Sequence, residues 1–289
     1  MPINTLVSRL TRQEDINFLL TNRLPRRLVT RFMGWFSKVE VAWIKNLSLA
    51  TWKLFAPDLD LSDAKKTSFK SLHDCFIREL KPGARNINHL PEIIISPCDA
   101  IVGEMGKVDD TRLYQAKGFP YRLEDLLHSA ELVNRYRNGL FVTLRLTSTM
   151  YHRFHAPCDC SLQTVNYISG DTWNVNPVAL KRVEQLFCKN ERVVLDLDTG
   201  DQEHAIALVP IAAILVASIK LHCLAEPLDL TYSGANHIQC SAQYRNGEEM
   251  GYFQHGSTIV VFARGGFEFV KDIETGLRIK MGQGLFMKT

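Results

Sequence analysis

Three short segments carry side chains suited to acid–base and nucleophilic chemistry. They are Ser96–Asp99 (SPCD), Tyr151–Pro157 (YHRFHAP) and His255–Thr258 (HGST). A serine hydroxyl becomes a good nucleophile when a base removes its proton, and a carboxylate that orients an imidazole base stabilises its charged form. Asp99, a histidine and Ser257 supply these three groups. Each also has an ordinary structural interpretation, because proline–aspartate and glycine–serine pairs are common in turns.

Other segments make the combination more specific. They are Leu80–Arg85 (LKPGAR), Ser169–Asp171 (SGD) with Val175–Asn176, Asn190–Val193 (NERV), Gly247–Gly251 (GEEMG) and Met281–Gln283 (MGQ). Taken in this order with the first three, they resemble the phosphatidylserine decarboxylase family, of the pyruvoyl-dependent, prokaryotic type. The resemblance spans roughly residues 65–285, so it is much more specific than any single motif.

The resemblance implies that the chain cuts its own backbone between Gly256 and Ser257. Ser257 would attack the carbonyl of Gly256, with His155 as the base and Asp99 as its orienting partner. Elimination and hydrolysis would then convert Ser257 to a pyruvoyl group and release ammonia. The products would be a long chain, 1–256, and a short chain, 257–289, associated as a heterodimer; a homodimer of this pair is left open.

The resemblance also implies the reaction. The pyruvoyl group would form a Schiff base with phosphatidylserine and accept the electron pair released with CO2, giving phosphatidylethanolamine. No external cofactor and no metal would be needed. The family assigns the later protonation to the position of His152. Residues three apart in a strand point to opposite faces, so different tasks for His152 and His155 are geometrically natural, although a bulge before Pro157 would bring them to one side.

Three positions depart from the family pattern. His255 stands where leucine is common, Ala100 stands where glycine is frequent, and Cys160 replaces a small turn residue. We interpret His255 as an inert replacement, with an additional base beside the cleaved bond as the alternative. None of the three departures removes a proposed catalytic group.

Helices are predicted in the part of the chain that precedes these segments. Thr11 and Glu14 form a candidate capping box, and Pro25 begins a second helical segment. A further helix is predicted where Phe69, Leu72, Phe76 and Leu80 recur, ending at Lys81-Pro82-Gly83.

The rest of the sequence has the pattern of strands. Strands are predicted at 140–146, at 193–198, directly after the Gly256-Ser257 pair at 258–262, and twice within 205–219; Asn246-Gly247 predicts a tight hairpin turn. We therefore expect an α+β protein, with N-terminal membrane-associated helices followed by a β-rich, largely antiparallel catalytic domain. The division is 1–82 for the helical membrane-associating region and 83–289 for the decarboxylase domain.

The charge distribution suggests contact with a membrane. The net charge of +3 is too small to indicate nucleic acid, but residues 16–57 hold seven basic residues and one acid, together with three of the four tryptophans. One helical face is predicted to carry Trp35, Phe36, Val39, Trp43, Leu47 and Leu54, as an interfacial anchor or as a helix packed on the catalytic domain. A lipid substrate favours the anchor, and Trp173 is expected in the core.

Composition and the type of substrate together predict a location. Seven scattered cysteines and the lack of a secretory signal pattern indicate a reduced, cytoplasmic protein. Since phosphatidylserine lies in the membrane, we expect a peripheral protein on the cytoplasmic side of the cell membrane, with no nucleic-acid partner.

Other functions remain open from sequence alone. His152, His155, Cys158 and Cys160 offer zinc ligands, although their spacing fits no closed structural pattern. A related pyruvoyl enzyme could act on a soluble amine or amino acid, because substrate choice depends on loops. A membrane-binding module without catalytic activity would remain one intact chain.

Overall fold

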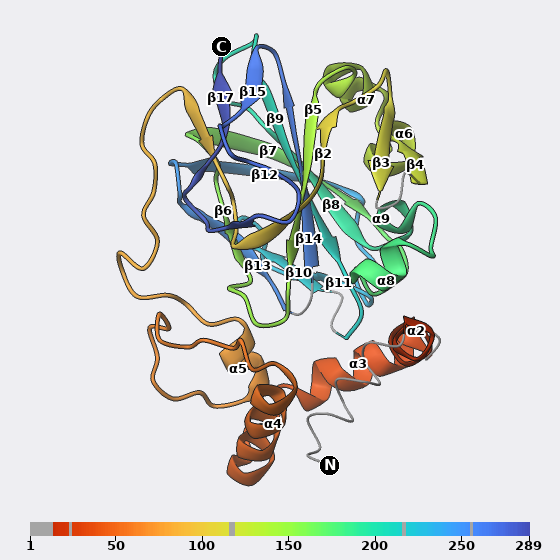
Figure 1. Ribbon diagram of the computed structural model, residues 1–289, viewed down its shortest axis with the longest axis vertical. Coiled ribbons are helices and arrows are strands. Elements are labelled where there is room, and N and C mark those ends of the chain that lie inside the picture. Colours follow the sequence, from red (N-terminus) through yellow and green to blue (C-terminus); the bar gives the residue numbers. More distant parts are fainter. Residues whose placement is uncertain (1–13, 23–24, 116–118, 216–217, 255–256) are drawn as a thin grey trace.

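A computed structural model of the chain describes residues 14–22, 25–115, 119–215, 218–254 and 257–289. Helices α2 (Glu14–Asn22), α3 (Arg26–Phe36), α4 (Ala42–Phe55) and α5 (Leu72–Phe76) precede the first strand and lie at one end of the β-rich body (Figure 1). The predicted start at Pro25 is confirmed, because its carbonyl accepts hydrogen bonds from the amides of Leu28 and Val29. Thr11, half of the proposed capping box, lies outside the described residues.

Two of the predicted helical features are wrong. The continuous face from Trp35 to Leu54 is divided between α3 and α4, because the carbonyl of Ser37 accepts the amide of His73 from α5 and the chain turns there. The helix predicted from Phe69 to Leu80 is only the short α5. Beyond α5 the chain pairs with the preceding loop instead, through hydrogen bonds from Lys65 and Lys81 to Glu79 and Asp63.

An antiparallel sheet of eight strands forms the centre of the body (Figure 1). Its order is β12 (His237–Tyr244), β7 (Cys160–Ile168), β8 (Arg192–Leu197), β9 (Ala205–Ala212), β14 (Ser257–Arg264), β5 (Leu140–Leu146), β2 (Ala100–Lys107) and β16 (Arg278–Ile279). The strands predicted at 140–146, 193–198 and 258–262 are confirmed as β5, β8 and β14. The apolar run 205–219 contains β9 and the start of β10, as expected.

A second sheet covers one face of the large one. Its order is β11 (Leu228–Asp229), β10 (Ser218–Leu221), β13 (Glu249–Phe253) and β6 (Arg153–His155). Apolar side chains from both sheets, among them Phe154, Phe253, Leu144 and Val261, form one buried cluster between them.

Short helices cover the opposite face. They are α6 (Leu123–Leu127), α7 (Ala130–Tyr136), α8 (Pro177–Leu180) and α9 (Leu186–Lys189), beside the ribbon β3 (Arg112–Gln115) and β4 (Phe119–Arg122). Together with the large sheet they enclose a second buried cluster. A three-stranded sheet, β1 (Ile93–Ile95), β17 (Gly284–Lys288) and β15 (Phe267–Phe269), completes the body. The α+β fold with largely antiparallel sheets is thus confirmed.

The turn at Asn246-Gly247 exists, but it does not make a hairpin. Gly247 has a φ of +80°, and a Cβ there would lie 2.5 Å from a side-chain atom of Ile87. The strands that the turn joins belong to different sheets, since β12 pairs with β7 whereas β13 pairs with β6 and β10. The local turn was predicted correctly, and its strand partners were not.

Candidate active site

The register of the large sheet brings the three segments named at the start of the sequence analysis to the same end of its strands. Ile101 of β2, Arg145 of β5 and Thr258 of β14 form a row across neighbouring strands. β2 and β14 are each antiparallel to β5, so they run in the same direction. Asp99 and Ser257, which precede these residues, therefore lie at the same end of the sheet. β5 leaves the sheet at that end too, and leads through residues 147–152 into β6 (Figure 1).

Ser257 is the first residue of β14 and is buried between two strands. It pairs with Leu146 on one side and Ala212 on the other. Its side chain shares the strand face of Ile259 and Val261, which belong to the core between the two sheets. The Oγ atom has no hydrogen-bond partner among the described residues. A buried hydroxyl without a partner is costly, and a role in chemistry is one reason for a protein to keep it. The two residues that precede it in the chain, His255 and Gly256, lie outside the described residues.

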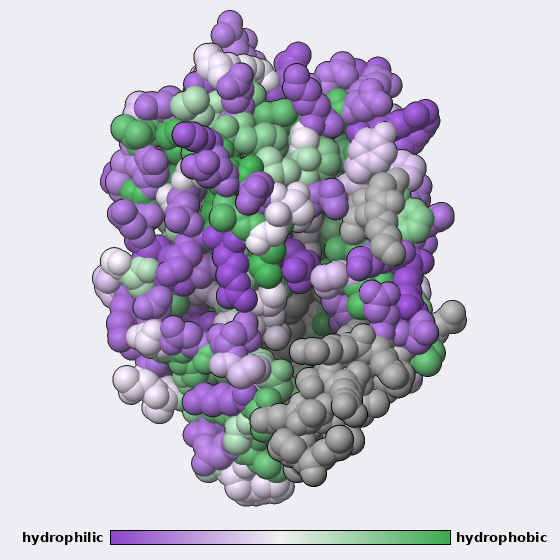
Figure 2. Space-filling model, viewed as in Figure 1, coloured by the Kyte–Doolittle hydropathy of each residue, from purple (hydrophilic) through white to green (hydrophobic). Residues whose placement is uncertain are grey.

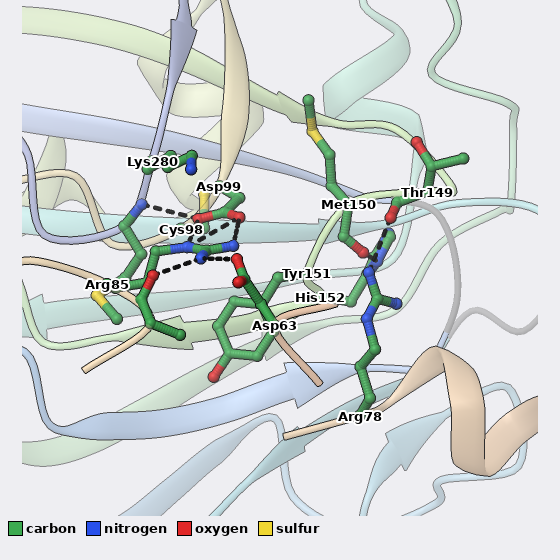
Figure 3. A network of polar contacts seen from close by, with 12 residues as sticks. Asp63, Arg78, Arg85, Cys98, Asp99, Thr149, Met150, Tyr151, His152 and Lys280 are labelled. Atoms are coloured by element: carbon green, nitrogen blue, oxygen red, sulfur yellow. Dashed lines mark hydrogen bonds and ion pairs between the residues drawn. The ribbon is translucent and has the colours of Figure 1, made fainter. Parts of the chain in front are cut away.

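Asp99 is bound by an arginine that the catalytic hypothesis did not include. Arg85 Nε lies 2.9 Å from Oδ1 of Asp99, and Nη2 lies 2.5 Å from Oδ2, while the amide of Met281 also donates to Oδ1 at 2.9 Å. Figure 3 shows Arg85 between Asp99 and a second carboxylate, Asp63. Burial disfavours the charge on Arg85, but its contacts with both carboxylates outweigh burial and raise its pKa.

His155 is buried and held at both ring nitrogens. Nδ1 lies 2.8 Å from the carbonyl of Gly247 and therefore donates to it, which leaves Nε2 to accept the Tyr151 hydroxyl at 2.9 Å. Burial lowers the pKa of His155, only partly offset by the Gly247 carbonyl and nearby carboxylates, so the ring is neutral at neutral pH. A neutral imidazole is able to act as a base.

The structure places the proposed triad in one region without joining it by hydrogen bonds. The backbone amide of His155 donates to the carbonyl of Pro97, two residues before Asp99, at 2.8 Å. Among the described residues, however, no hydrogen bond links the side chains of Asp99, His155 and Ser257. Their assigned roles therefore stay predictions.

His152 is completely buried beside the helix α5. Its Nδ1 donates to the carbonyl of Met150 at 2.8 Å, and its ring centroid lies 4.0 Å from that of Phe76 (Figure 3 shows the Met150 contact). Its own carbonyl accepts the amide of Phe253, four residues before Ser257. The Tyr151–Pro157 segment is thus fastened to the strand that leads towards the proposed cleavage site.

A pocket of about 260 Å³ opens beside this region, lined by residues that include Arg85, Tyr151, His155 and Glu249. A larger pocket, of about 800 Å³, lies instead between the α6–α7 segment and β7, and none of the proposed catalytic residues lines it. The smaller pocket is therefore the better candidate for substrate access, because it exposes groups that can take part in the chemistry.

The zinc interpretation finds no support in the geometry. Within the described ranges, no three His, Cys, Asp or Glu side chains are grouped as metal ligands. His155 is occupied by Gly247 and Tyr151, and the thiols of Cys158 and Cys160 interact with each other. All seven cysteines lie in the described part of the chain and have free thiols.

Arg85 and Glu191 were missed as candidate residues of this region, and a third missed residue, Arg192, lies on the opposite face of the large sheet. Arg85 belongs to the LKPGAR segment, and Glu191 and Arg192 belong to NERV. Arg192 is buried and donates to backbone carbonyls of Asp125, Leu126, Cys188 and Asn190. Charged residues inside distinctive segments were the available signal. Their partners at the site, Asp99 for Arg85 and Tyr167 for Glu191, lie 14 and 24 residues away in sequence.

Comparison with known proteins gives one consistent result. The family model described as phosphatidylserine decarboxylase matches residues 72–287. A phosphatidylserine decarboxylase proenzyme of Saccharophagus degradans is 31% identical over 94% of this chain and 96% of its own length. A proenzyme of the same name from Haemophilus influenzae is 34% identical over 92% of this chain and 93% of its own length. Another from Brevibacillus brevis is 31% identical over 93% of this chain and 96% of its own length. This chain belongs to the phosphatidylserine decarboxylase family.

Proposed function

We propose that this protein cuts itself before Ser257 and decarboxylates phosphatidylserine to phosphatidylethanolamine with the pyruvoyl group formed there. The supporting observation is the environment of Ser257. Its buried Oγ has no hydrogen-bond partner among the described residues, and it lies at the end of the large sheet where the segments of Asp99 and His155 converge. The site suits a pyruvoyl group, because a small ketone at this position replaces a hydroxyl that makes no described hydrogen bond.

Self-cleavage follows from the chemistry of the chain's own residues. For cleavage, the Tyr151 hydroxyl must leave Nε2 of neutral His155, which then takes the proton of the Ser257 hydroxyl. The oxygen bonds to the carbonyl carbon of Gly256, and the C–N bond breaks as nitrogen gains a proton. Loss of the Ser257 α-proton and rupture of its Cβ–O bond then release Gly256 as a carboxylate. Asp99, fixed by Arg85, supplies negative charge near the imidazolium.

Decarboxylation needs an electron acceptor and a proton donor. The pyruvoyl ketone supplies the acceptor for the electron pair that remains when the substrate carboxylate leaves as CO2. His152 donates its Nδ1 hydrogen to Met150, so Nε2 is the ring nitrogen left for the substrate. Nε2 first takes a proton, which makes the ring an imidazolium, and then transfers that proton to the substrate carbon. Burial of His152 excludes competing water.

The N-terminal helices provide the proposed membrane contact. Leu28, Phe32 and Trp35 of α3 and Trp43 and Leu47 of α4 are each more than half exposed. Basic side chains accompany them, a combination that suits the headgroup region of an anionic bilayer. Figure 2 shows pale and green side chains at the end of the molecule where α4 lies.

We also propose that the protein is peripheral and lies on the cytoplasmic side, with residues 1–82 as the membrane-associating region and 83–289 as the catalytic domain. The exposed side chains of α3 and α4 support the membrane contact. Within the described residues, no helix has the length and hydropathy needed to cross a bilayer. Trp173, expected in the core, is half-buried, with the Arg26 guanidinium 3.8 Å from its ring centroid.

The two cleavage products are proposed to remain together, because β14 pairs with β5 and β9 of the long chain along its whole length.

Intact-mass analysis tests the cleavage. We expect two chains from the native protein, a short one of 33 residues (289 − 256) that lacks a free amino terminus, and one uncut chain from Ser257→Ala. Ser218→Ala is the matched control, because Ser218 is also buried with an Oγ that has no described partner. A single intact chain in active native protein would refute the proposal.

The roles of the two histidines are distinguished by measuring both cleavage, by intact mass, and the release of CO2. His155→Ala should prevent cleavage, whereas His152→Ala should cleave and then fail to decarboxylate. The reverse pattern would exchange their roles.

Sedimentation with phosphatidylserine-containing vesicles tests the membrane contact. Trp35→Ser and Trp43→Ser should each weaken binding about tenfold, since an indole contributes on the order of 1.5 kcal/mol or more when it leaves water. Leu90→Ser, which removes an exposed apolar side chain from the catalytic domain, should not change binding. If Trp35→Ser and Trp43→Ser bound the vesicles as tightly as Leu90→Ser, the assignment of α3 and α4 to the membrane contact would be refuted.

A further inference from the structure

Glu191 is a buried carboxyl that the proposed mechanism does not use. It lies directly before β8 and is only 2% exposed. Its Oε1 accepts the hydroxyl of Tyr167 at 2.5 Å, and its Oε2 has no hydrogen-bond partner among the described residues. Half of the acceptor capacity of this carboxyl is therefore available to a ligand.

The strand register places Glu191 and Ser257 on the same face. The amide of Ala212 donates to the carbonyl of Glu191 at 2.8 Å, and Ala212 is also the strand partner of Ser257. The three residues form a row across neighbouring strands, in which the α-carbons of Glu191 and Ser257 are about 10 Å apart, or two strand spacings.

Side-chain alternation shows which face this is. Val193 of β8 and Ile259 of β14 belong to the core between the two sheets, and Glu191 and Ser257 lie two residues from each. Only the methyl group of Ala212 separates the two polar side chains along the row. The carboxyl of Glu191 and the position of the proposed pyruvoyl group thus lie on the same face of the sheet, with one residue between them along the row.

The surroundings of Glu191 favour a cationic ligand. Burial raises its pKa to about 7, the Tyr167 hydroxyl opposes this shift, Asp229 of β11 adds to it, and Arg27 of α3 lowers it weakly. No ion pair with Glu191 occurs among the described residues. Asp99, by contrast, already has Arg85 as its counter-ion. A positive group beside Glu191 would stabilise its ionised form.

We propose that Glu191 binds the ammonium group of the substrate and takes one proton from it. This inference rests on the proposed function, because it needs the reactive ketone at position 257. One N–H bond of the ammonium breaks, its electron pair stays on nitrogen, and the proton bonds to Oε2 of Glu191. The neutral amine so formed is a nucleophile, whereas the ammonium is not. Tyr167 holds Oε1, which leaves Oε2 to receive the proton.

The variant Glu191→Gln tests this role, since glutamine keeps the size of the side chain and can accept the Tyr167 hydrogen bond but cannot take a proton. The matched control is Glu184→Gln, at an exposed position. Both variants should still cut into two chains by intact mass. The probes are phosphatidylserine in mixed micelles and phenylhydrazine, whose nitrogen is uncharged at neutral pH. Mass spectrometry of the short chain measures how fast each probe becomes attached to it. For the lipid, cyanoborohydride reduces the Schiff base so that the attachment is permanent.

We expect Glu191→Gln to capture phosphatidylserine about 100-fold more slowly at pH 7, and the rate to recover as pH rises and the free amine forms in solution. Phenylhydrazine should react at the native rate, because it needs no base. Equal loss with both probes, native-rate capture of the lipid, or an uncut chain would each overturn the assignment of Glu191 to the substrate amine. Native protein that remains uncut, or captures neither probe, would instead refute the proposed function.

Discussion

The raised pKa of Glu191 predicts a measurable pH dependence of folding stability. Its pKa is about 7 in the folded protein against a reference of 4.5, mainly because of burial. Between these values the folded state holds a proton that the unfolded state has lost. The associated stability is complete below about pH 4.5 and is lost as pH rises through 7. A shift of 7 − 4.5 = 2.5 units corresponds to roughly 3 kcal/mol.

The change Glu191→Gln should remove this dependence. Urea unfolding at pH 5 and pH 8, in the Ser257→Ala background so that each protein stays one chain, gives the free energy of unfolding. We expect the parent with Glu191 to lose about 2.5 kcal/mol more than the Glu191→Gln variant between these pH values, or about 5–10 °C in Tm. Other titrating groups are common to both proteins and cancel in the difference.

Glu184→Gln controls for loss of an exposed carboxyl and should leave the pH profile of the parent unchanged. Parallel profiles for the parent and the Glu191→Gln variant would refute the reasoning, because they would mean that burial does not hold a proton on this carboxyl. The result does not depend on catalysis, so it tests the physical premise of the substrate-amine proposal separately.

Three further substitutions test contacts that hold the site. Arg85→Met should lower the free energy of unfolding by about 3–5 kcal/mol and slow self-cleavage, because Asp99 is left buried without its cation; unchanged urea curves would contradict this. Gly251→Ala should cost about 1–3 kcal/mol or more by thermal unfolding, since its Cβ would lie 2.2 Å from the carbonyl oxygen of Lys220, and a native Tm would show that the strands adjust freely. Arg192→Met should cost about 3 kcal/mol in urea, because it leaves several buried carbonyls without a donor, and a smaller loss would mean that other donors replace it.

Local patterns predicted much of the fold. Alternating apolar residues identified β5 and β8, and Pro25 marked the start of α3. The predictions failed where a distant partner decided the outcome. Ser37 ends the expected continuous helix because its carbonyl binds His73, and the Asn246-Gly247 turn joins two different sheets because β12 and β13 each pair elsewhere.

The sequence by itself determined which segments bear the chemistry, because Asp99, His152, His155 and Ser257 lie in ordered motifs that resemble those of the family. Only the tertiary structure decided what surrounds them. A strand pattern tells which face a residue occupies, but not which strand lies beside it. The register that sets Glu191 one alanine away from Ser257 joins positions 66 residues apart (257 − 191), and the Arg85–Asp99 pair joins positions 14 apart. Neither contact was predicted, because both lie beyond the few residues over which a local pattern carries information.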